Sequence, residues 1–483
     1  MNQSEVGYVV SSRDFLIYLN GFPTIKVNDM VESDNGLRGW VNSTLKDKIE
    51  VLMLDEGEIK PKQQFKKLPD RLGITVGDFL LSRAVNPLGV PIDGKGLLSH
   101  TKSTNISELD KEAPGIESRE FITNQFLTGI TLIDTLIPLG QGQRELVLGD
   151  AHSGKTAFLI DTVINQKNTG VICVIASIGK PAVTVRNLID TLRNNGALDY
   201  TVVVATSSSE PAPLIFLTPK TAMTIAEYFQ SLGKNVLLIL DDLGSHAKIY
   251  REISLLGNKA PGRESYPGDI FYQHAHLLER AGNFLPQFGG GSITALPVIE
   301  LNLNDFTTLI PTNVMSMTDG HLMFKAVLRS QGQTPAIDIS LSVSRVGRQT
   351  QDHLTNLLST KIRQVLSETA DLETISRFSS ELPAETQLIL RRKDLIIEIL
   401  KQESLTAVVK QIQVILLALP FTTFLQDKNK AFIEKYKPGL IENFLKNPAL
   451  LPITKSINQL KTDDELIKLL EGIGPVLSKL CPA

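Results

Sequence analysis

The feature that most constrains this chain is the segment GDAHSGKT at residues 149–156, which matches the pattern G-x-x-x-x-G-K-[ST] at every fixed position. It follows an apolar run at 145–148 and opens a helical pattern over 155–165. Glycines let backbone N–H groups curl around phosphate oxygens, and a helix N-terminus adds positive potential. The segment therefore predicts a phosphate-binding loop (P-loop) between a buried strand and a helix.

Phosphate chemistry predicts a role for each residue type in this loop. Lys155 is expected to bridge the outer phosphates, and the Thr156 hydroxyl to ligate magnesium. A second metal-side residue is expected at Asp241, because a carboxylate that ends a buried run (236–240) needs a partner. Asp242 is expected to cap the next segment. The predicted nucleotide-binding residues of the loop are Gly149, His152, Ser153, Gly154, Lys155, Thr156 and Ala157. His152 either contacts phosphate or lies at the surface.

The rest of the pattern predicts a multidomain chain, since 483 residues exceed one ordinary core. Short alternating runs broken by turn residues indicate an N-terminal β-barrel over 1–74, with a sandwich as the alternative. Runs rich in Val, Ile and Leu, separated by helix-length segments, indicate a central α/β P-loop nucleotide-binding domain over 75–352. Beyond these residues long helical patterns predict a C-terminal α-helical bundle over 353–483.

Individual elements follow from the same patterns. Strands are expected at 7–19, 25–31, 37–45, 49–54, 145–148, 171–178, 200–205 and 236–240. Helices are expected at 155–165, 183–194, 384–402, 406–417, 424–447 and 463–470. The helix at 384–402 is expected to place Leu388, Leu395, Ile396 and Ile399 on one side, with Glu398 among the polar positions.

Charge and composition exclude several classes of protein. A net charge of −3 gives no sign of a polyanion-binding surface, so no nucleic-acid partner is expected. The two cysteines, Cys173 and Cys481, cannot build a disulfide framework, which favours a reducing, cytoplasmic setting. No run approaches the roughly 20 apolar residues of a membrane helix. Any connection to the inner face of the cell membrane is therefore expected to go through partner subunits.

Further motifs resemble the alpha subunit of F-type ATP synthases. They are GQREL (142–146), PGRESYPGD (261–269), GGGSITALPVIE (289–300), IPTNVMSMTDG (310–320) and SVSRVG (342–347), together with MVE (30–32) and GLRG (36–39) in the barrel. The resemblance runs from about residue 7 into the C-terminal domain and weakens after about residue 405. Several of these motifs separate alpha from the catalytic beta subunit.

The resemblance implies a RecA-like central domain and a ring of alternating alpha and beta chains around a rotating, gamma-like shaft. It implies that ATP or ADP binds at the interfaces and that the sites carried mainly by beta hydrolyse ATP. It also implies that Arg345 reaches into the beta site as an arginine finger, where a guanidinium can meet the charge of phosphoryl transfer bidentately. The alternative for Arg345 is a surface salt bridge. Residues 378–386, which include Ser380, are expected to face the shaft, with an ordinary helix connection as the alternative.

The chain also departs from this family. Catalytic relatives carry a glutamate after the strand at 171–178, whereas Lys180 stands here, and a charged lysine cannot act as a base. Alpha subunits usually carry glutamine at that position. Glu210 is the nearest acidic candidate, with a solvated loop residue as its alternative. The missing base favours a non-catalytic site.

The adenine side and the N-terminus differ as well. Ala151 and His152 stand where alpha chains usually carry arginine and glutamine, and Thr334 stands where an arginine precedes the adenine-side proline, Pro335. Gln402 keeps one adenine-side glutamine, while Ser404 replaces the second. The first strand begins near residue 7, without the usual N-terminal helical extension. The chain thus resembles a divergent member, as in the additional rotary ATPases of mycoplasmas.

The sequence therefore favours a non-catalytic, nucleotide-binding alpha-type subunit. The first alternative, a self-sufficient ring ATPase of the export or beta type, needs a carboxylate where Lys180 stands. The second, a ring-shaped RNA translocase, needs a basic groove studded with aromatic residues, for which the barrel offers Phe15, Tyr18, Phe22 and Trp40. The third, a ring member that no longer binds nucleotide, conflicts with the intact P-loop.

Overall fold

The computed structural model describes residues 5–98, 106–302, 305–376 and 383–481. The chain forms two compact units. The first comprises 1–121, 141–151 and 166–321, and the second comprises 122–140, 152–165 and 322–483. The chain passes from the first unit to the second inside the P-loop, between Ala151 and His152. The domain boundaries at 74 and 352 stay predictions.

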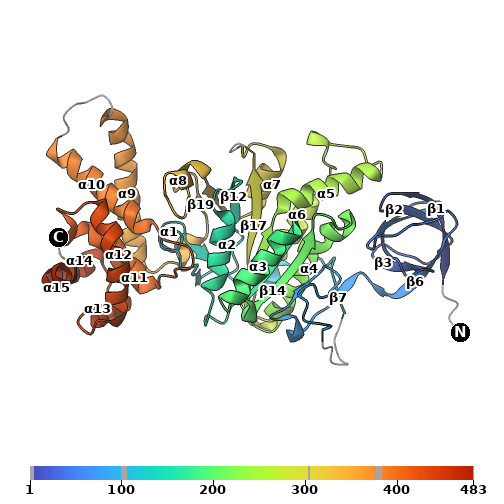
Figure 1. Ribbon diagram of the computed structural model, residues 1–483, viewed down its shortest axis with the longest axis horizontal. Helices are drawn as coiled ribbons and strands as arrows, with labels where there is room; N and C mark the ends of the chain where they lie inside the picture. Colours follow the sequence, from blue (N-terminus) through green and yellow to red (C-terminus); the bar gives the residue numbers. More distant parts are fainter. Residues whose placement is uncertain (1–4, 99–105, 303–304, 377–382, 482–483) are drawn as a thin grey trace. The chain divides into compact units, whose positions relative to one another are not determined.

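The N-terminal strands of the first unit form a closed antiparallel barrel in the order β1-β2-β5-β4-β3-β6 (Figure 1). The strands are β1 (Val6–Arg13), β2 (Leu16–Asn20), β3 (Asp29–Ser33), β4 (Arg38–Thr44), β5 (Ile49–Met53) and β6 (Gln64–Arg71). The barrel, rather than a sandwich, is confirmed. The run predicted at 7–19 is two strands, which turn at Asp14 with φ +56°. The polar β6 lies outside the predicted strands.

A parallel sheet follows in the first unit, in the order β12-β17-β15-β13-β14-β8. Its strands are β8 (Ala84–Val85), β12 (Leu146–Asp150), β13 (Ile172–Lys180), β14 (Thr201–Ser207), β15 (Val236–Asp241) and β17 (Ser292–Leu301). Buried Val, Ile and Leu fill these strands because helices cover a parallel sheet on both faces. Strands β12, β13 and β15 end at Asp150, Lys180 and Asp241. Charged residues therefore lie at the carboxyl ends of these parallel strands.

Helices of the first unit pack on this sheet (Figure 1). They include α3 (Ala182–Asn194), α4 (Ala212–Ser231), α5 (Leu243–Leu256), α6 (Ile270–Glu279) and α7 (Leu309–Met317). Helix α4 is buried along most of its length and contacts β13, β14 and β15, which fits a helix that is apolar on all sides. The helix predicted at 183–194 is confirmed as α3.

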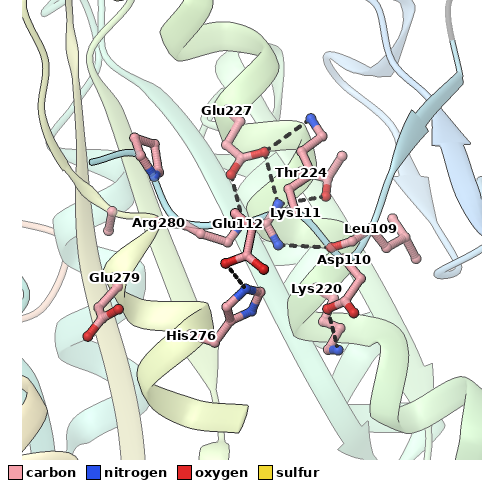
Figure 2. Close-up of polar contacts among 12 residues, drawn as sticks. Leu109, Asp110, Lys111, Glu112, Lys220, Thr224, Glu227, His276, Glu279 and Arg280 are labelled. Atoms are coloured by element: carbon pink, nitrogen blue, oxygen red, sulfur yellow. Dashed lines mark hydrogen bonds and ion pairs between the residues drawn. The ribbon is translucent and has the colours of Figure 1, made fainter. Parts of the chain in front are cut away.

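A buried ion-pair cluster ties the segment after the barrel to the helices of the sheet (Figure 2). Arg280 is 1% exposed, and its Nε and Nη2 donate to the two carboxylate oxygens of Glu227 at 2.6 and 2.9 Å. The same guanidinium donates to the Leu109 carbonyl at 2.9 Å and to the Thr224 hydroxyl at 3.0 Å. Lys111 pairs with Glu227 at 3.3 Å. Residues 109–111 are thereby fixed against α4 and α6.

The second unit is mainly helical. Its helices include α1 (Thr131–Leu136), α2 (Lys155–Ile164), α8 (Ala326–Ser330), α9 (His353–Ser376), α10 (Ala384–Leu400), α11 (Lys410–Ala418), α12 (Lys430–Lys446), α13 (Leu451–Ser456), α14 (Asp463–Gly472) and α15 (Gly474–Leu480). It also contains β19 (Val343–Ser344), whereas β18 (Gly320–Phe324) runs across the division between the units. The predicted C-terminal helical bundle is confirmed.

Two of the predicted helices begin later than their patterns indicate. The helix expected at 406–417 begins at Lys410, because Val409 just before it has an extended backbone, with φ −67° and ψ +148°. The helix expected at 424–447 begins at Lys430, where the Asn429 side chain accepts a hydrogen bond from the Phe432 amide as an N-cap. Most of the segment expected to face a shaft, including Ser380, lies outside the described residues. Across the described ranges, no helix has the length and apolar character needed to cross a membrane.

Candidate nucleotide site

The P-loop connects the end of β12 to the start of α2. Gly154 adopts φ +103°, a conformation that favours glycine, and lies at the N-terminus of α2. Ser153 and Lys155 are buried, whereas His152 and Thr156 are exposed. His152 has φ +60°, and its exposure agrees with the surface alternative for this side chain. Loop and helix thus have the local form that phosphate binding requires.

The second unit has a pocket that begins at this loop. Its lining includes Ser153, Gly154, Ala157, Arg329, Pro335 and Gln402. Five of these six, all but Arg329, are among the residues that the sequence predicted for nucleotide binding. The fold therefore joins a phosphate end, at the loop, to the predicted adenine side at Pro335 and Gln402.

In the sequence, Pro335 lies 178 positions after Ala157, so the closeness of the two residues in this pocket comes from the fold alone. Arg329, in α8, is a lining residue that the sequence reasoning missed. Its guanidinium lies against the loop, because a Cβ added at Gly154 would come within 2.9 Å of Arg329 Nη1. The signal that the sequence offered for Arg329 was a cationic residue shortly before the predicted adenine-side segment.

Gln402 contributes to the pocket wall through hydrogen bonds within the second unit. Its side-chain oxygen accepts from the Thr131 amide and hydroxyl, both at 3.0 Å. Its side-chain nitrogen donates to the carbonyls of Gly129, at 2.7 Å, and Thr406. The backbone amide of Gln402 also donates to the Thr334 carbonyl at 2.7 Å. Gln402 therefore holds together three segments around the pocket.

Ser404, which replaces the second glutamine, is part of the same wall. Its side chain hydrogen-bonds to Asp161 of α2, and the Leu405 amide donates to the Asp161 carboxylate at 3.0 Å. Burial raises the pKa of Asp161, and these hydrogen bonds only partly offset that effect. Asp161 also lines the pocket and is a second residue that the sequence reasoning missed. Its place two turns into the helix that follows the loop was the only signal.

At the carboxyl ends of the parallel strands in the first unit, Lys180 pairs with two carboxylates. Lys180 Nζ lies 3.0 Å from Asp241 Oδ1 and 3.2 Å from Asp242 Oδ2. Burial lowers the pKa of Lys180, but attraction to Asp241 and Asp242 outweighs that effect and raises it above its usual value. Lys180 is therefore charged at neutral pH. Asp242 also caps α5, as predicted, by accepting a hydrogen bond from the Ser245 amide at 2.5 Å.

Arg345 lies in the second unit on a tightly held turn. The Ser344 hydroxyl donates to the Pro138 carbonyl at 2.6 Å and accepts from the Gly347 amide at 3.2 Å. A Cβ added at Gly347 would overlap the Pro138 carbonyl, so this position requires glycine. The Arg345 side chain is exposed and has no hydrogen bond or ion pair to any residue that the structure describes. Within those residues, the surface salt bridge considered for Arg345 is absent.

Comparison with protein-family models gives two matches. Residues 129–344 match the nucleotide-binding domain of the ATP synthase alpha/beta family, and residues 351–473 match the C-terminal domain of the ATP synthase alpha/beta chain. The chain belongs to the ATP synthase alpha/beta family. Its architecture of barrel, α/β domain and helical domain is that of the family, and it is a subunit of a rotary ATPase.

Members of the alpha/beta family usually bind magnesium with the nucleotide. Magnesium prefers oxygen ligands in octahedral geometry. Among the described residues, no group of three or more His, Cys, Asp or Glu side chains could hold a metal ion. Asp241, the predicted metal-side carboxylate, already contacts the Lys180 ammonium. A magnesium ion at Asp241 would share this carboxylate with the ammonium, and the metal role of Thr156 and Asp241 stays a prediction.

Glu210, the nearest acidic candidate for a base, lies in the loop after β14, next to the segment that pairs with Lys180. Its carboxylate accepts a hydrogen bond from the Ser207 amide at 2.7 Å, within its own loop. It lines a cavity of about 400 Å³ together with the acidic residues Asp14, Asp55, Glu56 and Glu252. Burial, and then repulsion from Glu56, raises the pKa of Glu210. These contacts assign Glu210 a role in its loop and give no support to a role as a base.

Proposed function

We propose that this chain is a nucleotide-binding but non-catalytic alpha-type subunit of a rotary ATPase, and that Arg345 acts in the site of an adjacent beta-type subunit. The observation that carries the first part is the ion pair of Lys180 with Asp241 and Asp242. A general base must accept a proton from the attacking water. A charged ammonium, stabilised by two carboxylates, cannot accept one.

The same chain keeps the means to bind ATP or ADP. We assign the phosphates to the loop residues Gly149, His152, Ser153, Gly154, Lys155, Thr156 and Ala157, and the adenine side to Pro335 and Gln402. The pocket that joins Ser153, Gly154 and Ala157 to the last two residues supports this assignment. The metal side predicted at Thr156 and Asp241 does not enter the proposal, since Lys180 contacts Asp241.

The assignment of Arg345 rests on its exposure and on the rigidity of its turn. A transition-state partner supplied to a neighbour must project from its own subunit and be held in place. The Ser344–Pro138 hydrogen bond and the close approach at Gly347 hold the turn, and Arg345 has no partner among the described residues. These features fit an arrangement in which alpha-type and beta-type chains alternate in a ring around a central shaft.

The RNA-translocase alternative loses its main support in the barrel. Phe15, Phe22 and Trp40 are only 9%, 7% and 5% exposed. Bases stack on aromatic side chains that are open to the groove. Three of the four aromatic residues considered for RNA stacking are thus core residues. The export-type and beta-type alternatives require a carboxylate at a position where this chain has Lys180.

The first experiment measures binding and turnover by the purified full-length chain. We expect calorimetry to detect ATP and ADP binding, and a coupled assay to detect no steady ATP hydrolysis. Lys155→Ala should weaken binding strongly because the loop loses its phosphate-bridging cation. Steady hydrolysis by the chain alone that disappears in Lys155→Ala would refute the non-catalytic assignment.

The second experiment measures ATP hydrolysis by the assembled complex. Arg345→Ala should lower turnover by about two orders of magnitude or more while assembly and nucleotide binding to this chain persist. Arg345→Lys should restore little, since an ammonium cannot make a planar two-pronged contact. Arg348→Ala is the matched control, because Arg348 is an exposed arginine of the same segment that bonds to Asn356 and Thr360. Normal turnover in Arg345→Ala would refute the assignment.

A further inference from the structure

The adenine-side wall of the nucleotide pocket is held from outside by a lysine of α12. We propose that Lys437 is a positioning residue of this site, which fixes the peptide group between Lys401 and Gln402 and so sets the shape of the pocket for the base. The inference rests on the proposed function, because it concerns the same pocket of the second unit. Lys437 is not among the described residues that line this pocket, so it acts through the Gln402 segment.

The carbonyls at the end of α10 need partners from outside the helix. Helix α10 ends at Leu400, and the next residue, Lys401, is extended, with φ −63° and ψ +137°. The last carbonyls of a helix have no donor within it and form the negative end of its dipole. The Lys437 ammonium donates to the Ile399 carbonyl at 2.6 Å and to the Lys401 carbonyl. Within the described part of the chain Lys437 forms no ion pair, so these two carbonyls are its main polar partners.

The peptide group between Lys401 and Gln402 is fixed from two sides. Its carbonyl accepts a hydrogen bond from Lys437. Its N–H, the backbone amide of Gln402, donates to the Thr334 carbonyl at 2.7 Å. Gln402, Thr334 and the following Pro335 all line the nucleotide pocket. A shift of this one peptide group would therefore displace both segments of the predicted adenine side.

Packing alone does not hold the Gln402 segment against α12. A cavity of about 460 Å³ adjoins the segment, and its lining includes Thr334, Gln402 and Glu403 together with Lys437 and Ile441 of α12. Side chains that face a cavity lack contacting atoms on that side. The hydrogen bonds from Lys437 join α12 to the segment beside this cavity. They supply, on the α12 side, a restraint that packing does not provide.

The experiment separates the two ends of the ligand. ADP and pyrophosphate are titrated calorimetrically into the full-length natural chain, Lys437→Met and Lys437→Arg. We expect Lys437→Met to weaken ADP binding by about tenfold, the size of one lost hydrogen bond from a charged donor. Pyrophosphate affinity should change by less than about threefold, because this ligand occupies the P-loop without the adenine side. Lys437→Arg should restore most of the ADP affinity, since a guanidinium can also donate to two carbonyls.

The matched control is Lys446→Met. Lys446 lies on the same helix, its side chain is 75% exposed, and it pairs with Glu442, so its loss should leave both affinities unchanged. An unchanged ADP affinity in Lys437→Met, or an equal loss of pyrophosphate affinity, would overturn the inference while leaving the proposed function intact. Absence of ADP binding by the natural chain would instead overturn the proposed function.

A measurement on the natural chain decides the matter even if Lys437→Met fails to fold. Coupling is reciprocal, so ADP must strengthen the contact of Lys437 with the Gln402 segment if that contact favours ADP binding. Acetic anhydride acetylates the free amine of lysine, and mass spectrometry gives the rate at each residue. Saturating ADP should slow acetylation of Lys437 by about fivefold or more relative to pyrophosphate, while Lys446 reacts equally with either ligand. Equal rates at Lys437 with ADP and with pyrophosphate would overturn the inference.

Discussion

Replacing Glu227 by glutamine should destabilise the first unit strongly, because it removes the only carboxylate that meets the buried Arg280 guanidinium among its described contacts (Figure 2). Arg280 is 1% exposed and the Glu227 side chain 17% exposed, so the pair is largely shielded from water. Breaking a buried ion pair by removing one partner costs about 3–5 kcal/mol. Glutamine can still accept one hydrogen bond, and the Leu109 and Thr224 contacts remain, so we expect about 3 kcal/mol.

The assay is urea unfolding followed by the fluorescence of Trp40, the only tryptophan in the sequence. Trp40 is buried in the barrel and stacks on Phe216 of α4, with ring centroids 6.1 Å apart. Its emission therefore reports on the first unit. With a slope of about 1–3 kcal/mol per molar urea, a loss of this size lowers the midpoint by about 1 M or more.

Two variants make the test specific. Asp190→Asn breaks the exposed pair between Asp190 and Arg193 in the same unit and should change stability by less than about 1 kcal/mol. The double variant Glu227→Met with Arg280→Met should recover much of the loss, since a buried ion pair can be exchanged for apolar side chains at little cost. The reasoning is refuted if Glu227→Gln leaves the midpoint unchanged, or if the double variant is less stable than Glu227→Gln.

Three further predictions concern the second unit and its partners. A cross-linker placed at Ser380 should capture a shaft subunit in the assembled complex; products with alpha-type or beta-type chains alone would contradict the resemblance on which this expectation rests. Arg329→Ala should weaken ATP binding by about tenfold in calorimetry, as expected when one charge-assisted contact is lost, whereas an unchanged affinity would exclude Arg329 from the site. Burial lowers the pKa of Lys437 to about 8 from a reference value of 10.5, so between these pH values the unfolded chain binds more protons and stability rises with pH. Calorimetric unfolding at several pH values should show this rise in the natural chain, and a rise of equal size in Lys437→Met would disprove the attribution.

Local patterns in the sequence predicted much of the fold and of the site. The P-loop, the strands at β12, β13, β14 and β15, and the helices at α2, α3 and α14 all lie where their patterns place them. Each of these features depends on residues close together in the chain, such as an apolar run, a capping residue or a fixed spacing of glycines. The short strands of the N-terminal domain and the C-terminal helical bundle follow from the same kind of local information, whereas closure of the barrel depends on the pairing of β1 with β6.

Local patterns predict the burial of individual residues less well where a neighbouring element decides which face of a helix is covered. In α10, Leu395, Ile396 and Ile399 are buried as predicted, but Leu388 is 45% exposed. Glu398, expected among the polar positions, is 8% exposed and pairs with Lys401 at 2.7 Å. A periodic pattern gives the average direction of an apolar face, whereas the neighbouring elements set where that face ends.

The sequence by itself determined that the chain carries a P-loop, an acidic strand end and a lysine where a catalytic glutamate would stand. Only the tertiary structure decided what these residues do to one another. Lys180 meets Asp241 because β13 and β15 are adjacent in the sheet, an order that no local pattern encodes. Gln402 likewise accepts a hydrogen bond from Thr131, 271 positions away in the sequence, because the fold brings their two segments together. Contacts of this kind depend on the packing of whole elements, and packing is settled by the chain as a whole rather than by any one segment.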